Sequence, residues 1–113
     1  MSGKFSPVTD ADFDQRVLES TTPVLVDFHA DWCFPCKQLA PMLDDMVGEF
    51  GGELVIHGLD VGANPGVRDR YGIRGIPALL IFKDGKIIAR SQSHSSRTEL
   101  ASFIEKALSG AAK

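Results

Sequence analysis

The spacing of the apolar side chains changes in the first half of the chain from the pattern of a buried strand to that of a helix. Residues 24–28 (Val-Leu-Val-Asp-Phe) form a nearly continuous, β-branched apolar run, which is typical of a strand covered on both faces. Beyond residue 33 the apolar side chains recur along one helical face, at Leu39, Met42, Leu43, Met46, Val47 and Phe50. A buried strand that leads directly into a long amphipathic helix predicts an α/β layer architecture.

The rest of the chain alternates between helix and strand patterns in the same way. We expect helices over residues 9–20, 33–50, 65–71 and 96–108, and strands over residues 24–28, 54–59, 78–82 and 87–89. Pro41 should kink the second helix, because its ring nitrogen cannot donate a hydrogen bond to the carbonyl four residues back. The dipeptide Asp84-Gly85 between two strand patterns predicts a hairpin. This order implies a central mixed sheet, parallel in its first half and antiparallel in its last two strands, with helices on both faces.

Length, charge and hydropathy limit the class of protein. The 113 residues fit a single domain spanning residues 1–113, with a frayed tail over residues 109–113. The net charge is −3 and the basic residues are scattered, so we expect no nucleic-acid partner. The longest apolar run, residues 76–82, is far shorter than the ~20 residues that span a bilayer, and the chain starts without a signal-peptide pattern. We therefore expect a monomeric, cytoplasmic protein with no membrane partner.

The only two cysteines, Cys33 and Cys36, lie at the predicted start of the long helix. Unpaired backbone N–H groups and the positive end of the helix dipole favour a thiolate there. We expect Cys33 to be the more exposed nucleophile and Cys36, one turn further on, to resolve a mixed disulfide. Pro35 has no N–H to leave unpaired in the first turn and stiffens the helix entry. The alternative is a zinc half-site, but a structural zinc ion needs four ligands, and the sequence has no second cysteine pair and no His-x₃₋₅-His motif.

Four segments resemble, in the correct order, the corresponding segments of thioredoxins. They are residues 24–37, 64–66, 71–77 and 82–85, and the similarity extends essentially without gaps from about residue 8 to residue 108. The resemblance implies the thioredoxin fold and the reduction of protein disulfides by dithiol–disulfide exchange. It also implies that the protein binds no cofactor and receives its electrons from NADPH through a thioredoxin reductase.

Asp27 is a single carboxylate in an apolar strand pattern, where burial would raise its pKa. The resemblance implies that it is the family's buried acid, which exchanges a proton with the second cysteine, here Cys36; the alternative is a solvated carboxylate at the end of the strand. Gly58 stands where thioredoxins commonly have a lysine near this acid, which should leave Asp27 easier to protonate. His29 stands where many members have tryptophan, and it either favours the Cys33 thiolate when protonated or packs as a neutral ring.

The resemblance also implies a substrate groove next to the cysteines. Its matching residues are Trp32, Gly75, Ile76 and Pro77. In thioredoxins the matching proline is cis, and the residue before it pairs with an extended substrate segment; for Trp32 the alternative is simple core packing. Phe34 replaces the usual glycine between the cysteines and adds apolar surface that can restrict or select substrates. Ser93 and His94 replace a small apolar pair of the groove.

Three functions are consistent with these residues. The first is a protein-disulfide reductase that uses Cys33 and Cys36. The second is a disulfide oxidant or isomerase, which a measured reduction potential would distinguish from the first. The third is a non-catalytic binding subunit with a thioredoxin fold, which would bind partners in the groove without turnover.

Overall fold

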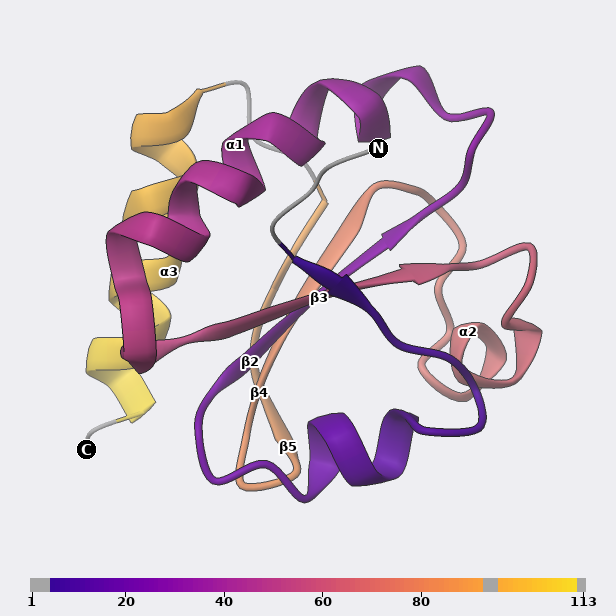
Figure 1. The fold of residues 1–113 in the computed structure, drawn as a ribbon, viewed down its shortest axis with the longest axis horizontal. Helices are drawn as coiled ribbons and strands as arrows, with labels where there is room; N and C mark the ends of the chain where they lie inside the picture. Colours follow the sequence, from indigo (N-terminus) through magenta and orange to yellow (C-terminus); the bar gives the residue numbers. More distant parts are fainter. Residues whose placement is uncertain (1–4, 93–95, 112–113) are drawn as a thin grey trace.

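The computed structural model describes residues 5–92 and 96–111, and its sheet has the strand order β1-β3-β2-β4-β5 (Figure 1). The strands are β1 (Ser6–Pro7), β2 (Val24–His29), β3 (Val55–Asp60), β4 (Ala78–Lys83) and β5 (Lys86–Ser91). Strand β3 pairs in parallel with both β1 and β2, while β4 is antiparallel to β2 and to β5. The predicted mixed sheet is therefore confirmed.

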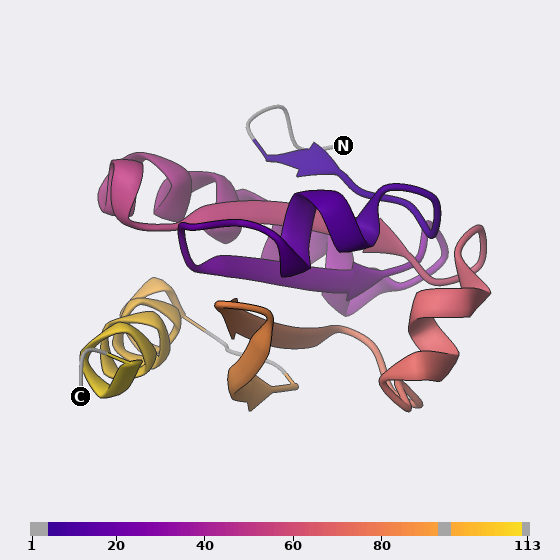
Figure 2. The same ribbon diagram turned by 90° about the horizontal axis from the view of Figure 1, so that it is seen from below.

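The helices lie on both faces of this sheet (Figure 2). They are α1 (Phe34–Phe50), α2 (Pro65–Arg70) and α3 (Arg97–Ala111), with a π-helical turn η1 (Asp14–Leu18) and a 3₁₀ turn η2 (Gly51–Glu53). Buried side chains of α1 from Leu39 onward join one apolar cluster with those of α3, whereas those of η1 and α2 join the other cluster, which also contains Cys33 and Cys36. The fold class expected from the sequence, a thioredoxin fold with helices on both faces of the sheet, is confirmed.

Alternation along β2 decides which side chains face α1. Val24, Val26 and Phe28 pack in the cluster with η1 and α2, whereas Leu25 packs in the cluster with α1 and α3. Because successive side chains of a strand point to opposite faces, Asp27 and His29 lie on the same face as Leu25. The only carboxylate of β2 therefore faces the helix that begins at the cysteine pair.

The predicted hairpin matches the structure. Asp84 and Gly85 have φ values of 52° and 78°, as a tight turn between β4 and β5 requires. Helix α1 contains Pro41, where the kink stays a prediction, and it ends at Gly51, whose φ of 53° suits glycine. At the start of α3, the Ser96 hydroxyl accepts a hydrogen bond from the amide of Glu99 at 3.1 Å, as in a capping box.

Three local features differ from the expectation. The helix expected over residues 9–20 is reduced to η1, because the Asp12 carboxylate accepts hydrogen bonds from the Thr9 amide and hydroxyl and closes a turn in place of the first helical turn. Strand β1 was not predicted, since two residues that include a proline carry no strand pattern. Helix α3 extends to Ala111 and so includes part of the tail expected to be frayed. None of the helices in the described ranges combines the length and hydrophobicity needed to span a membrane.

Candidate active site

The cysteine pair lies where the loop after β2 turns into α1. Cys33 is the N-cap of α1, with an extended backbone, and its Sγ accepts a hydrogen bond from the amide of Cys36 at 3.3 Å. The two cysteines are joined as a disulfide with a Cα–Cα distance of 5.3 Å. The sulfur of Cys33 therefore lies in the field of the unpaired N–H groups of the first helical turn, as the sequence predicts.

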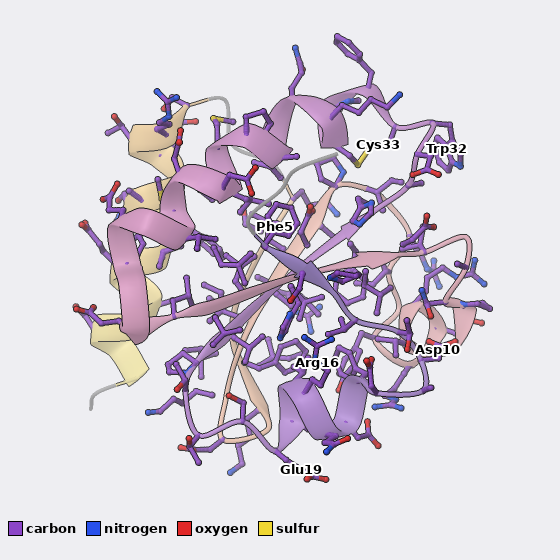
Figure 3. All side chains as sticks on the ribbon, viewed as in Figure 1. Phe5, Asp10, Arg16, Glu19, Trp32 and Cys33 are labelled. Carbon is purple, nitrogen blue, oxygen red and sulfur yellow. A yellow bond between two sulfur atoms is a disulfide. The ribbon has the colours of Figure 1, made fainter. Side chains whose placement is uncertain are left out.

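The exposure of the two cysteines differs from what we expected. We expected Cys33 to be more exposed than Cys36, but each residue is 4% exposed. The reason is that the Cys33 sulfur is bonded to Cys36 and turned toward the Cys36 amide, so the disulfide form presents neither residue to solvent. The exposed groups are instead the neighbouring aromatic side chains, Phe34 at 68% and Trp32 at 77%, of which Figure 3 labels Trp32 next to Cys33. Core packing of Trp32 is thereby excluded.

Asp27 is buried, with 1% of its surface exposed, so the alternative of a solvated carboxylate is wrong. Its Oδ1 is buried without a hydrogen-bond partner among the described residues. Removing a carboxylate from water disfavours its charged form, and this desolvation raises the pKa of Asp27 to about 7. A group with this proton affinity can give or accept a proton near neutral pH.

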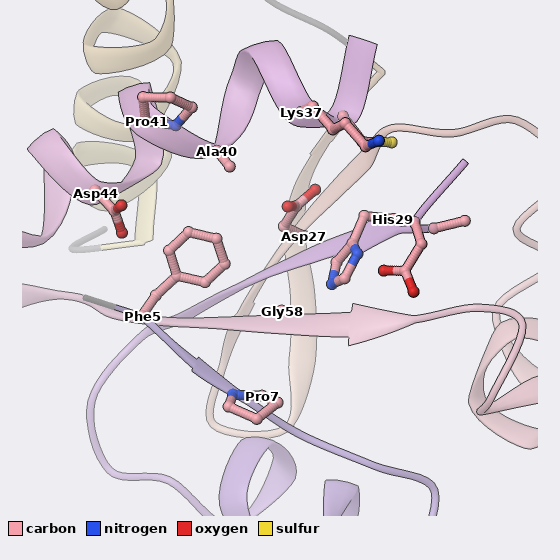
Figure 4. A pocket seen from close by; sticks show the side chains of 12 residues that line it. Phe5, Pro7, Asp27, His29, Lys37, Ala40, Pro41, Asp44 and Gly58 are labelled. Atoms are coloured by element: carbon pink, nitrogen blue, oxygen red, sulfur yellow. The ribbon is translucent and has the colours of Figure 1, made fainter. Parts of the chain in front are cut away.

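Asp27 and Cys36 line a common cavity of about 540 Å³ between α1, β1 and the ends of β2 and β3 (Figure 4). Its other lining residues are Phe5, Pro7, His29, Ala30, Asp31, Lys37, Ala40, Pro41, Asp44 and Gly58. Sequence reasoning identified Asp27, Cys36, His29 and Gly58 near the site but missed the contribution of Phe5. The signal was available, since Phe5 precedes Pro7 by two residues and alternation places both on one side of an extended segment.

His29 and Phe5 pack over Gly58. A Cβ atom built on Gly58 would lie 3.0 Å from Cε2 of Phe5 and 3.1 Å from Nε2 of His29. Any side chain at position 58 would therefore have to displace one of the two rings. Burial lowers the pKa of His29, partly opposed by the carboxylates of Asp60 and Asp31. Of the two interpretations of His29, the structure favours the neutral ring near neutral pH.

The predicted groove residues lie at the same end of the sheet as the cysteines. The Ile76–Pro77 peptide bond is cis, as the resemblance implies. Pro77 directly precedes β4, whose first residue, Ala78, pairs with Phe28 near the end of β2. Ile76 packs against the apolar cluster that contains Cys33 and Cys36. Gly75 is half-buried next to Gln92, while Ser93 and His94 lie outside the described residues.

Comparison with known proteins agrees with this geometry. The family model described as thioredoxin matches residues 4–106, and a thioredoxin of Pseudomonas aeruginosa is 43% identical over 105 residues, which cover 93% of this chain and 97% of that protein. The chain belongs to the thioredoxin family. Thioredoxin C-2 of Corynebacterium nephridii is 44% identical with the same coverage, and thioredoxin 1 of Synechococcus elongatus is 44% identical over 101 residues, 89% of this chain and 94% of that protein.

Family membership and the cysteine pair together define the reaction. The protein is a dithiol–disulfide oxidoreductase with protein-disulfide reductase activity. Among the residues that the structure describes, no group of three or more His, Cys, Asp or Glu side chains is placed to hold a metal ion.

Proposed function

We propose that Cys33 attacks a disulfide of a substrate protein and that Cys36 resolves the resulting mixed disulfide. In the first step the Cys33 thiolate bonds to one substrate sulfur, and the other substrate sulfur leaves and takes up a proton. In the second step Sγ of Cys36 attacks Sγ of Cys33, and the remaining substrate sulfur leaves. The two thiols thereby supply both electrons and end as a disulfide.

One observation carries this proposal, the hydrogen bond from the Cys36 amide to Sγ of Cys33 at the first turn of α1. An N–H group that points at a sulfur stabilises its anion and lowers its pKa. Pro35, at the start of α1, contributes by fixing the backbone of this turn.

Asp27 acts in this scheme as the proton acceptor for Cys36. The thiol of Cys36 has to lose its proton before its sulfur can attack. Asp27 lines the same cavity as Cys36, and its raised pKa gives it the proton affinity that the transfer needs. In the reverse direction the protonated carboxyl returns the proton to Cys36 when the disulfide is reduced.

The substrate segment binds in the groove between the Trp32–Phe34 aromatic pair and the loop before β4. Backbone groups of Gly75 and Ile76 would pair with an extended substrate segment, with cis Pro77 shaping the turn. The resemblance adds Ser93 to the residues that would contact the substrate. The exposed ring of Phe34 favours substrates that carry apolar side chains beside the attacked disulfide, because the contact removes apolar surface from water.

The electrons come from NADPH through a thioredoxin reductase, and the protein itself holds no cofactor. The protein works as a monomer in the cytoplasm, where reduced thiols persist and the dithiol form can be maintained. This assignment rests on the family membership of the chain.

The test is a protein-disulfide reduction assay with NADPH and a thioredoxin reductase. We expect turnover by the wild-type protein, none by Cys33→Ser, and covalent capture of one substrate molecule by Cys36→Ser. Turnover by Cys33→Ser at the wild-type rate would overturn the assignment of the nucleophile. A redox titration of the wild-type couple against glutathione separates a reductase from an oxidant, because an oxidant has the less negative potential.

A further inference from the structure

Asp27 can accept the proton of Cys36 only in its ionised form, yet its carboxyl group is almost sealed from water. Asp27 is 1% exposed, and its Oδ1 has no hydrogen-bond partner in the described part of the chain. Below its pKa of about 7 the carboxyl holds a proton before the resolving step begins and has to lose it first. A second group that takes this proton from Asp27 and passes it to solvent would make the ionised form available.

The titratable groups around the cavity that could do this come from three elements. They are His29 on β2, Asp31 in the loop that follows β2, and Lys37 and Asp44 on α1. Pro7 on β1 and Phe5 just before it carry no charge. Asp60 on β3 acts on His29 through its charge. Of these groups, only an imidazole gains and loses a proton readily near neutral pH.

Geometry brings the His29 ring back toward Asp27. The two residues are two positions apart on β2, so both side chains point to the face of the sheet that α1 covers. Asp27 pairs in register with Gly58 on β3, and Nε2 of His29 lies 3.1 Å from the place where a Cβ of Gly58 would be. The imidazole and the Asp27 side chain therefore lie on the same face of the sheet around one register position, and both line the same cavity.

The side-chain-free surface of Gly58 makes this position available to the ring. A larger residue at position 58 would displace either the imidazole or Phe5. His29 is half-buried, whereas Asp27 is buried, and both line the cavity. Of these two residues, His29 is therefore the one whose side chain is in contact with solvent.

We propose that His29 carries protons between Asp27 and solvent, acting through Asp27 on the resolving step of Cys36. Before the resolving step a protonated Asp27 gives its proton, through a water molecule, to a ring nitrogen of the neutral imidazole. The imidazolium releases a proton to solvent, so His29 returns to its neutral form. The ionised Asp27 then accepts the proton of the Cys36 thiol. This proposal rests on the proposed role of Asp27.

The proton affinities of the two groups support this transfer. Burial raises the pKa of Asp27 to about 7 and lowers the pKa of His29, whose ordinary value is 6.5. A free carboxyl and a free imidazole differ much more strongly. Burial thus removes the large gap by which a free carboxyl binds a proton more weakly than an imidazole, which lets a proton pass between the two groups.

The test follows the two steps of one turnover separately, with 5,5′-dithiobis(2-nitrobenzoate) as the disulfide. Attack by Cys33 releases a first coloured thiolate at a rate that depends on reagent concentration. Resolution by Cys36 releases the second at a rate that does not. The variant is His29→Gln, which keeps a polar side chain but cannot titrate, and the matched control is His57→Gln, since His57 lies on β3 and does not line the cavity.

We expect His29→Gln to slow the second phase about tenfold at pH 6, where Asp27 starts protonated and has to release its proton first. The difference should vanish above about pH 8.5, where Asp27 is ionised before the reaction begins. The first phase should be unchanged, and His57→Gln should follow the wild-type pH profile. In an Asp27→Asn background, His29→Gln should have no further effect, because the two residues act on one proton.

The outcomes separate this proposal from the function on which it rests. Slowing of the second phase by the same factor at every pH would mean a structural role for His29 and would overturn the relay. An unchanged second phase in His29→Gln would do so as well. Failure of the wild-type protein to release the second thiolate at all would instead contradict the proposed roles of Cys33 and Cys36.

Discussion

Replacing Asp27 by asparagine should stabilise the oxidised protein by an amount that grows with pH. The pKa of the carboxyl is about 7 in the folded protein and 3.8 in the absence of burial. Because the folded-state value is the higher one, its contribution to stability is fully present below pH 3.8. It is lost progressively as the pH rises to 7, since the unfolded chain ionises first. Asparagine has a similar shape and no charge, so the variant does not suffer this loss.

The size of the effect follows from the two pKa values. Each pKa unit of difference corresponds to about 1.4 kcal/mol. The unfolding free energy of the wild-type protein therefore falls by about 4 kcal/mol between pH 3.8 and pH 7 through Asp27, and that of the variant does not. Solvent does not screen this effect as it would at the surface, because Asp27 is 1% exposed. An effect of this size is a large fraction of the 5–15 kcal/mol by which domains are typically stable.

Urea unfolding of the two oxidised proteins at a series of pH values between 4.5 and 8.5 measures this difference. The oxidised form is used because its cysteines are paired in a disulfide and do not titrate. The difference in unfolding free energy should be small at the acidic end, should rise by about 1.4 kcal/mol per pH unit and should level off above pH 7. A difference that stays constant across this range would refute the reasoning, because it would mean that Asp27 is ionised in the folded protein throughout.

Four further substitutions, one of them a control, test separate parts of the structure. Phe34→Gly should raise KM for a peptide disulfide with apolar flanking residues several-fold more than for one with polar flanks, measured by steady-state reduction; equal changes for both would exclude a specificity role. Gly58→Ala should cost about 1–3 kcal/mol in urea unfolding, because its Cβ would meet two rings. Gly48→Ala, whose Cβ would meet nothing within 4 Å in α1, should gain about 0.5 kcal/mol, and loss of stability in both variants would argue against the ring contact as the cause. Asp10→Ala removes the carboxylate that accepts from the amides of the first turn of α2, and should lower the unfolding free energy by about 1 kcal/mol; no change would show that these hydrogen bonds add nothing to stability.

The elements that hold the cysteines could be predicted because their signals are local and strong. The apolar run of β2 and the helical period of α1 each extend over several residues, and the change between them fixes where the chain turns. The position of Cys33 at the first turn of α1 follows from that change alone. The burial of Asp27 follows from the same pattern, since a side chain within an apolar strand is buried when both faces of the sheet are covered.

Features that depend on contacts between distant segments could not be predicted in this way. β1 exists because Ser6 and Pro7 pair with His57 and Gly58 at the edge of β3, some fifty residues away, and two residues carry no periodicity. The acceptor for the first turn of α2 is the distant carboxylate of Asp10, which no local capping pattern indicates. The equal burial of the two cysteines depends on the disulfide itself.

The unusual residues at positions 29 and 58 form one physical unit. A side chain at position 58, where the family commonly has a lysine, would press against the rings of His29 and Phe5 as they are placed here. Lys37 lines the same cavity, but desolvation is the cause of the raised pKa of Asp27, and no charged group of the described residues opposes it. Such an acid holds its proton more strongly than one beside a lysine, and it therefore has the greater need of a neighbour that can remove it. The glycine that takes the place of the family's lysine beside Asp27 is also the residue over which the imidazole packs.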